Sequence, residues 1–281
     1  MCSGSVNETF PTPYEDLNVV LRAFTTQAQA ILAGGLIGIY LQGSFAAGDF
    51  DRHSDVDFTV VTTAEPSDTN VEALNALHER VFRLEIPWAQ HLEGSYFPQG
   101  LLRDPASCGQ PVWYLDHGSR ALVRSDHDNT LVVRWVLREH GIALIGPDPA
   151  TLIDPFSDDA LRREIEAVMR GWGAEILKEP ERWTSHFYQT FIVLSYCRML
   201  QSLETGKILS KRAGAEWGKA HLDPSWGKLI DRTWAGRPDP AASSRRPADP
   251  ADFQATLDFV HYAIGLIRRF MPEAREQPPE T

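Results

Sequence analysis

Cysteine is scarce in this 281-residue sequence, and long apolar runs are missing. The three cysteines, Cys2, Cys108 and Cys197, are an odd number without metal-type spacing, so they indicate neither a disulfide framework nor a zinc site. Nowhere do about eighteen apolar residues follow one another, which argues against a membrane-spanning helix. The first twelve residues lack the basic start and apolar core of a signal peptide. We therefore expect a cytoplasmic protein that does not enter membranes.

Basic residues are also in short supply. Lysine and arginine number 27 against 38 aspartates and glutamates, for a formal net charge of −11. Because binding to a phosphate backbone depends on Lys and Arg, this balance argues against a nucleic-acid partner and suits a cationic one. The sequence contains no Gly-x-x-x-x-Gly-Lys, Gly-x-Gly-x-x-Gly or Gly-x-Ser-x-Gly motif, so P-loop, dinucleotide-binding and serine-hydrolase chemistry have no support.

Hydrophobic periodicity divides the chain near Pro155. Before that point short apolar runs alternate with helical patterns, and after it almost every pattern is helical. The predicted strands are 36–41, 55–61, 89–97, 110–115 and 142–145, and the predicted helices are 14–32, 71–83, 129–140, 158–177, 186–204, 210–221, 224–234 and 253–271. We therefore expect an α+β protein of two domains. Residues 1–154 form a mixed sheet with flanking helices, and residues 155–281 form an all-helical bundle.

One stretch carries the residues expected for chemistry. A short apolar strand runs into Gly43-Ser44, and after a spacer Ser54 precedes Asp55-Val56-Asp57 on a second strand. Because side chains two apart on a strand face the same way, Asp55 and Asp57 should project together. Two neighbouring carboxylates repel each other unless a cation lies between them, and hard oxygen ligands select Mg²⁺. The pattern therefore predicts a magnesium site.

Gly43 and Ser44 supply the second half of this pattern. A glycine lets the backbone approach a bulky anion, and Ser44 offers a hydroxyl and an N–H at a predicted helix start. Asp-x-Asp and Gly-Ser are each common by chance, but the order strand, Gly-Ser, spacer and alternating Asp-x-Asp strand is rare. This stretch resembles the signature of the polymerase-β-like nucleotidyltransferases.

Further segments narrow the resemblance. The stretches 138–147, 194–198 and 205–208, and Trp217 within Ala215-Glu-Trp, are similar to the aminoglycoside adenylyltransferases that inactivate streptomycin and spectinomycin. The similarity extends over most of the chain in the same order. It implies an N-terminal nucleotidyltransferase domain and a C-terminal helical domain that contacts substrate and triphosphate. It also implies the transfer of AMP from ATP to a drug hydroxyl with Mg²⁺.

The resemblance implies a role for each matching residue in the first domain. Gly43, Ser44 and Ser54 correspond to groups that bind the nucleotide, the two serines through its phosphates. Asp55 and Asp57 correspond to the magnesium ligands, and both also count as catalytic residues.

Three further residues take roles from the same resemblance. Glu93 corresponds to the catalytic glutamate, and it lies on a strand flanked by apolar and aromatic residues, where a lone carboxylate needs a reason. Arg198 and Lys211 correspond to the cations that bind the triphosphate. Lys207 is a weaker alternative to Lys211.

The drug-binding positions match less well. In the family, acidic residues and a histidine precede the helical arginine and contact the drug. In this sequence, the corresponding positions before Arg198 are Thr184, Tyr188 and Phe191. A further acidic position corresponds to Asp126 or Asp128. We expect ATP and a cationic small molecule such as an aminoglycoside as partners of a monomer. Two alternatives stay open: an enzyme that transfers AMP to a protein or RNA, and a non-catalytic nucleotide-binding regulatory protein.

Overall fold

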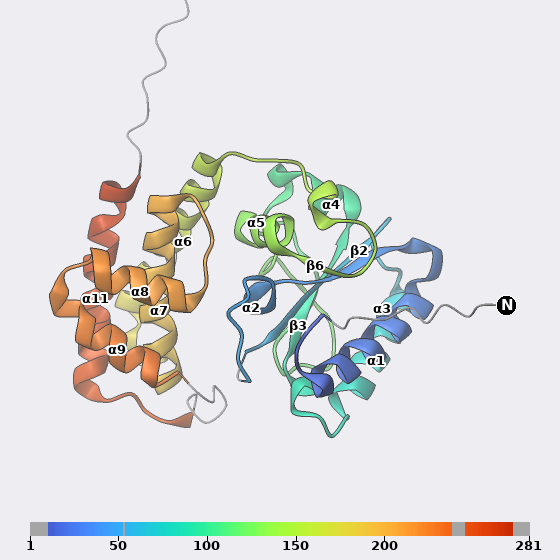
Figure 1. Cartoon of the computed structure of the whole chain (residues 1–281), viewed down its shortest axis with the longest axis horizontal. Coiled ribbons are helices and arrows are strands. Elements are labelled where there is room, and N and C mark those ends of the chain that lie inside the picture. Colours follow the sequence, from blue (N-terminus) through green and yellow to red (C-terminus); the bar gives the residue numbers. More distant parts are fainter. Residues whose placement is uncertain (1–10, 53, 238–244, 272–281) are drawn as a thin grey trace, which may run out of the picture. The chain divides into compact units, whose positions relative to one another are not determined.

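The computed structural model describes residues 11–52, 54–237 and 245–271. The chain divides into two compact units, Met1–Pro155 and Phe156–Thr281 (Figure 1). The first unit combines a mixed sheet with flanking helices, and the described part of the second unit contains helices but no strands. The α+β class expected from the sequence is confirmed.

Six strands form the sheet of the first unit. They are β1 (Leu36–Leu41), β2 (Val56–Thr62), β3 (Leu92–Pro98), β4 (Val112–Leu115), β5 (Val123–Ser125) and β6 (Ile142–Ile145), in the spatial order β5-β4-β3-β2-β1-β6. Only β2 and β3 run parallel, and the other neighbours are antiparallel. The N-terminal ends of β2 and β3 therefore lie at one edge of the sheet, together with the C-terminal ends of β1 and β4.

Two helices, α1 (Glu15–Leu32) and α3 (Asp68–Phe82), pack together against one face of this sheet (Figure 1). Their apolar residues share one core with those of β1, β2 and β3. Ser67 begins α3 as an N-cap, its side chain accepting a hydrogen bond from the backbone N–H of Asn70. Three shorter helices complete the unit: α2 (Gly43–Ala46), α4 (Gln99–Arg103) and α5 (Leu131–His140).

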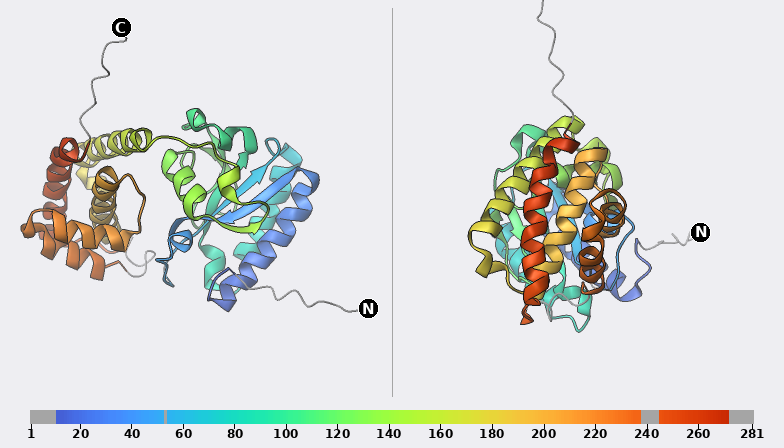
Figure 2. Two further views of the ribbon diagram at one scale, coloured as in Figure 1. Left: turned by 45° about the horizontal axis from the view of Figure 1, so that its top comes forward. Right: turned by 90° about the vertical axis from the view of Figure 1, so that its left-hand side faces the viewer.

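The second unit is built around one buried helix. In the part of this unit that the structure describes, the helices are α6 (Asp158–Lys178), α7 (His186–Thr205), α8 (Lys211–His221), α9 (Gly227–Ala235) and α11 (Pro250–Phe270). All four of the others pack against α7, and α11 runs along it (Figure 2). Twelve of the twenty residues of α7 are buried, which agrees with apolar side chains spread over more than one stripe of the helix.

Most element boundaries agree with the sequence patterns, and the exceptions have local causes. β3 begins at Leu92 rather than at residue 89, because Pro87–Gln90 forms a 3₁₀ turn. No pattern in the sequence predicts α4 or β5. β5 is three residues long and largely exposed, so it has neither an alternating pattern nor an apolar run to reveal it.

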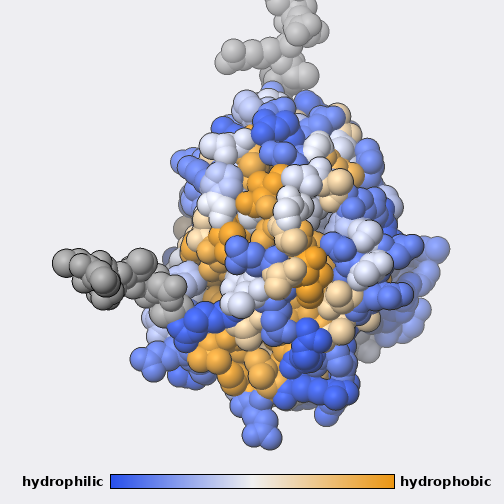
Figure 3. Space-filling view, turned by 90° about the vertical axis from the view of Figure 1, so that its right-hand side faces the viewer, coloured by the Kyte–Doolittle hydropathy of each residue, from blue (hydrophilic) through white to orange (hydrophobic). Residues whose placement is uncertain are grey.

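The surface of the first unit carries hydrophobic residues in separate patches among hydrophilic ones (Figure 3). In the described part of the chain, the exposed large hydrophobic residues are Val19, Val123 and Val168. Among the described helices, none combines the length and the apolar character that crossing a membrane requires.

A histidine lies in the core between α3 and the sheet. His78 is 2% exposed, its ring stacks on Phe58, and its Nε2 is 2.8 Å from the Tyr96 hydroxyl. Burial lowers the pKa of His78 from 6.5 to about 3. Between pH 6.5 and about 3, His78 is therefore neutral in the folded state and protonated in the unfolded chain.

This histidine predicts an acid-sensitive fold. Because the pKa of His78 is lower in the folded state, its neutral form stabilises the fold fully above pH 6.5, and this contribution is lost as the pH falls from 6.5 towards 3. We expect a loss on the order of 4 kcal/mol over that window. Urea unfolding at a series of pH values measures it. His78→Gln should flatten the dependence and the exposed His140→Gln should not, whereas equal slopes in all three proteins would contradict the assignment.

Candidate active site

Carboxylates gather where β2 and β3 begin. In the parallel register of these strands Asp57 lies beside Glu93, and Val56 beside Leu92. Neighbouring residues of a parallel pair face the same side of the sheet, so Asp57 and Glu93 share a face. Asp55, two residues before Asp57, directly precedes β2. The sheet thus brings the three acidic residues singled out in the sequence to one edge.

Gly43 fits closely against one of these carboxylates. It follows β1, whose C-terminal end pairs with the start of β2, and the backbone N–H of Gln42 donates to the Asp57 carbonyl at 2.9 Å. Gly43 has φ +61°, and a Cβ placed on it would lie 1.8 Å from Asp57 Oδ2. A residue with a side chain would therefore be strained and would displace the carboxylate. The glycine preserves the space in which Asp57 lies.

The two serines of the motif differ in their surroundings. Ser44 Oγ is buried and has no hydrogen-bond partner among the described residues. A buried hydroxyl without a hydrogen bond destabilises the fold unless a ligand forms that bond. The Ser44 hydroxyl therefore indicates where a polar group of a ligand could bind. Ser54 Oγ instead accepts a hydrogen bond from the backbone N–H of Asp51 at 2.9 Å, and the N–H of Ser54 donates to the Asp51 carbonyl at 3.1 Å. Ser54 therefore closes the turn that leads into Asp55.

The carboxyl of Glu93 has a raised pKa. Burial raises its pKa above the usual range, and the nearby charges of Asp55 and Asp128 raise it further. The Tyr114 hydroxyl, which donates to Glu93 Oε1 at 2.5 Å, and His127, whose Nε2 lies 3.7 Å from the same oxygen, lower it. Burial is the largest of these effects. A half-buried carboxyl with a raised pKa and a positioned hydrogen-bond donor suits proton transfer.

Asp128 adds a second buried carboxyl beside Glu93. It is 8% exposed and accepts a hydrogen bond from Ser95 Oγ at 2.8 Å. Burial raises its pKa, against the opposing effects of Ser95 and His127. Of the two acidic candidates of the sequence analysis, Asp126 is exposed, whereas Asp128 contributes to the electrostatics of Glu93.

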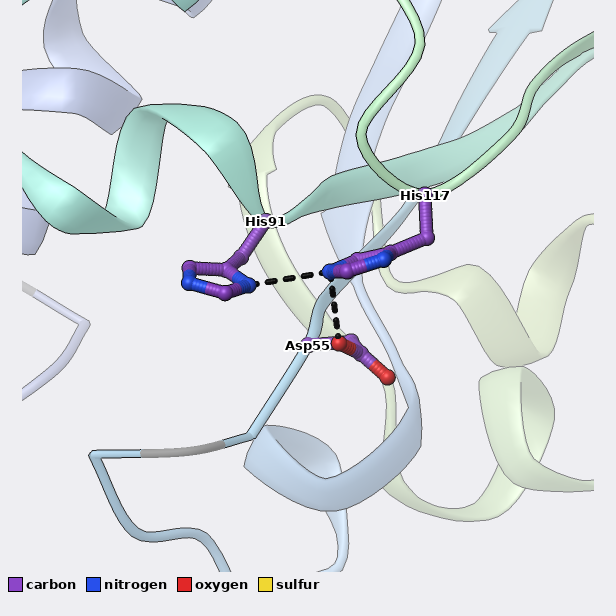
Figure 4. Close-up of side chains that lie close together, drawn as sticks. All are labelled: Asp55, His91 and His117. Atoms are coloured by element: carbon purple, nitrogen blue, oxygen red, sulfur yellow. Dashed lines mark hydrogen bonds and ion pairs between the residues drawn. The ribbon is translucent and has the colours of Figure 1, made fainter. Parts of the chain in front are cut away.

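Two histidines lie beside Asp55. Its Oδ1 is 3.1 Å from His117 Nε2, which is in turn 2.9 Å from His91 Nδ1 (Figure 4). His91 directly precedes β3, and His117 follows β4 by two residues. No pattern in the sequence indicates this arrangement. His117 and His127 are typical loop residues by sequence. The antiparallel return of β4 brings His117 to the site, and His127 reaches Glu93 from the segment that follows β5.

Ligand atoms of the described residues form two compact groups. One consists of Asp55, His91 and His117, and the other of Glu93, His127 and Asp128, and within each the ligand atoms lie within 4.8 Å of one another. Asp57 belongs to neither, since its carboxylate packs against Gly43. The two aspartates of the motif thus have different neighbours in this structure.

Arg198 and Lys211 lie in the second unit, on two helices that pack closely together. A Cβ on Gly214 of α8 would lie 2.8 Å from the Cα of Arg198 on α7, so this glycine permits the contact. Lys211 begins α8, and its Nζ lies 5.1 Å from the centre of the Phe191 ring, two turns before Arg198 on α7. Both cations therefore lie along the contact between α7 and α8, and Arg198 is half-buried.

Aromatic rings occupy the first turns of α7. Tyr188 meets Trp183 edge-on with ring centres 4.8 Å apart, and Phe191 meets Trp172 at 5.6 Å. Trp183 Nε1 is buried without a hydrogen-bond partner among the described residues, and Thr184 is exposed. Thr184, Tyr188 and Phe191, which the resemblance aligns with drug contacts, thus offer no carboxylate at the start of α7.

Comparison with known proteins matches both halves of the chain. Residues 27–90 match the family model of the nucleotidyltransferase domain, and residues 151–257 match that of the aminoglycoside adenylyltransferase C-terminal domain. An aminoglycoside (3'') (9) adenylyltransferase from Klebsiella pneumoniae is 24% identical over 83% of this chain and 88% of its own length. A spectinomycin 9-adenylyltransferase from Staphylococcus aureus is 24% identical over 72% of this chain and 77% of its own.

A solved structure has the same fold. The spectinomycin adenyltransferase AAD(9) from Enterococcus faecialis, with ATP and spectinomycin, superposes with a TM-score of 0.63 at 14% sequence identity. The match covers 88% of this chain and 98% of that one. With residues that match a nucleotidyltransferase domain and an aminoglycoside adenylyltransferase C-terminal domain, the chain is a nucleotidyltransferase enzyme that is similar over most of its length to aminoglycoside adenylyltransferases.

Proposed function

We propose that this enzyme transfers AMP from ATP to a hydroxyl of an aminoglycoside-type antibiotic and releases pyrophosphate. The observation that carries the proposal is the pairing of Asp57 with Glu93 at the sheet edge, next to the side-chain-free Gly43 and the unpartnered hydroxyl of Ser44. The carboxylates at this edge can bind a cation. The Ser44 hydroxyl and the backbone at Gly43, which no side chain covers, can contact an anion. The relatives are named for this reaction class.

The donor set fits magnesium. Asp55 and Asp57 offer carboxylate oxygens, the ligands that Mg²⁺ prefers, and both would hold the ion. Bound there, Mg²⁺ supplies positive charge against the phosphate oxygens of ATP. Ser44 and Ser54 would contact the phosphates, with the backbone at Gly43 close to the nucleotide. Arg198 and Lys211 keep their proposed role as phosphate-binding cations of the second unit.

Glu93 would act as the general base. Its carboxylate takes the proton of the acceptor hydroxyl as the oxygen forms a bond to the α-phosphorus, and the bond from that phosphorus to the bridging oxygen breaks. The electron pair of the broken bond leaves with pyrophosphate. The raised pKa of Glu93 supports this role, because a base with a pKa nearer neutrality holds the proton more firmly.

The acceptor is proposed to be cationic. Asp128 places a carboxyl next to Glu93, and the net charge of −11 favours a cationic partner. ATP and this small molecule are the partners proposed for a monomer that works in the cytoplasm.

Pyrophosphate release tests the proposal. The purified enzyme with ATP and Mg²⁺ should release pyrophosphate in the presence of streptomycin, spectinomycin or another member of an aminoglycoside panel, and the drug should gain the mass of AMP. Label from radioactive ATP on a protein or RNA, with every drug unmodified, would favour a macromolecular acceptor. ATP binding without any transfer would favour a non-catalytic regulator.

The hydrogen bond from Tyr114 predicts a shift in the pH dependence of the reaction. Tyr114→Phe removes a donor that lowers the pKa of Glu93, so that pKa should rise further. Because the base must be deprotonated, activity rises with pH through this pKa, and the acidic limb should move up by about one pH unit. The pH profile of kcat/KM measures the shift. An acidic limb that stays in place would show that Glu93 does not control it.

A further inference from the structure

Two imidazoles and one carboxylate converge at the start of β2, and the magnesium chemistry proposed above does not use the imidazoles. His117 Nε2 lies 2.9 Å from His91 Nδ1 and 3.1 Å from Asp55 Oδ1 (Figure 4). His117 Nε2 carries either one hydrogen or one lone pair, so it can make a good hydrogen bond to His91 or to Asp55 but not to both. A cation between the three side chains would accept a lone pair from each of them. We propose that Asp55, His91 and His117 bind a divalent cation of the zinc class.

The backbone holds these three groups in place. Asp55 and His91 each directly precede a strand of the parallel pair β2–β3, and the N–H of Val56 donates to the His91 carbonyl at 2.8 Å. β4 runs antiparallel to β3, so His117 at its C-terminal end returns to the same edge of the sheet. One ligand therefore lies next to an end of each of the three neighbouring strands β2, β3 and β4.

The donor set favours zinc over magnesium. Imidazole nitrogens are borderline ligands that suit Zn²⁺, Co²⁺ or Ni²⁺, whereas Mg²⁺ prefers oxygen. Zinc–ligand bonds of about 2.0–2.1 Å in a tetrahedron separate the ligand atoms by roughly 3.3 Å. The observed 2.9 and 3.1 Å approach this spacing, so small side-chain movements would complete the site.

Three protein ligands leave the fourth position of the tetrahedron open. Asp55 and His91 are half-buried and His117 is exposed, so a cation could exchange with the solution. A second group of similar chemistry, Glu93, His127 and Asp128, provides an internal comparison. Its His127 Nε2 lies 3.7 Å from Glu93 Oε1, a looser contact than those of His117.

The proposed site has a consequence for catalysis, and this part rests on the function proposed above. Zinc bound to Asp55 beside the histidines would neutralise the charge of this carboxylate and place a second divalent cation close to a magnesium ion held beside Asp57. Zinc at Asp55, His91 and His117 would therefore weaken magnesium binding and inhibit AMP transfer.

Metal binding is measured first, because it does not depend on activity. Titration of the full chain with Zn²⁺ in excess Mg²⁺, followed by calorimetry, should give one tight site per chain, and Co²⁺ should give the absorption bands of a tetrahedral N,O site. His117→Gln should weaken Zn²⁺ binding roughly 100-fold or more, since loss of an outer partner alone costs 10–100-fold. His127→Gln is the matched control and should keep the affinity of the unmodified protein.

The outcomes separate this site from the proposed function. No Zn²⁺ binding, unchanged affinity in His117→Gln, or a loss confined to His127→Gln would each overturn the site, whether or not the protein transfers AMP. Where AMP transfer is observed, Zn²⁺ near its dissociation constant should inhibit the unmodified protein but not His117→Gln. If zinc binds at this site without inhibiting AMP transfer, zinc at Asp55 does not weaken magnesium binding.

Discussion

Asp57→Asn is expected to reduce AMP transfer at least about 10³-fold, a loss of roughly 4 kcal/mol in transition-state stabilisation. The substitution keeps the shape of the side chain beside Gly43 but removes the negative charge that would hold Mg²⁺. Turnover of ATP and the best acceptor, measured over a range of Mg²⁺ concentrations, gives the size of the loss.

The fold should survive this change. Asp57 is half-buried, and the carboxylates at this edge repel one another. Removal of one charge should therefore leave the melting temperature unchanged or slightly higher. Asp68→Asn, at an exposed position of α3, is the matched control and should retain full turnover. Unchanged turnover in Asp57→Asn would refute its assignment as a metal ligand.

Glu93→Gln should lower kcat by about 10²–10⁴-fold while the affinity for ATP changes little. The amide keeps the size of the side chain and can still accept the hydrogen bond from Tyr114, but it cannot take a proton at neutral pH. Steady-state kinetics with both substrates, together with direct ATP binding, separates the two effects.

Glu85→Gln provides the comparison for this experiment. Glu85 is an exposed glutamate in the segment before β3, and its substitution should change neither kcat nor ATP binding. If Glu93→Gln lost turnover and ATP affinity to the same extent, Glu93 would be a binding residue rather than the base.

The strand, Gly-Ser and Asp-x-Asp pattern was sufficient to predict β1, β2 and a helix start at Ser44, because each has a local signal. Buried apolar runs mark both strands, and a glycine marks the turn between β1 and α2. The position of Glu93 beside Asp57 could not be derived in this way, since it depends on the parallel register of β2 and β3. The resemblance to a known family, rather than local physics, singled out that glutamate.

The histidines and Tyr114 were missed for a related reason. Tyr114 lies on β4, His91 precedes β3, and His117 and His127 follow β4 and β5. No pattern in the sequence specifies which loop residues return to the edge where β2 begins. The aromatic cluster around Trp172, Trp183 and Tyr188 was likewise invisible as a cluster, although the absence of acidic residues at Thr184, Tyr188 and Phe191 was evident from the sequence.

The pairing of Asp57 with Glu93 also determines where this protein can tolerate changes in length. Residues 63–91 connect β2 to β3, and a change of length in the loops on either side of α3 leaves the two strands aligned side by side. One residue inserted within β3 ahead of Glu93 would instead turn the glutamate to the opposite face of the sheet. The loops of this connection should therefore tolerate insertions and deletions that the first residues of β3 cannot.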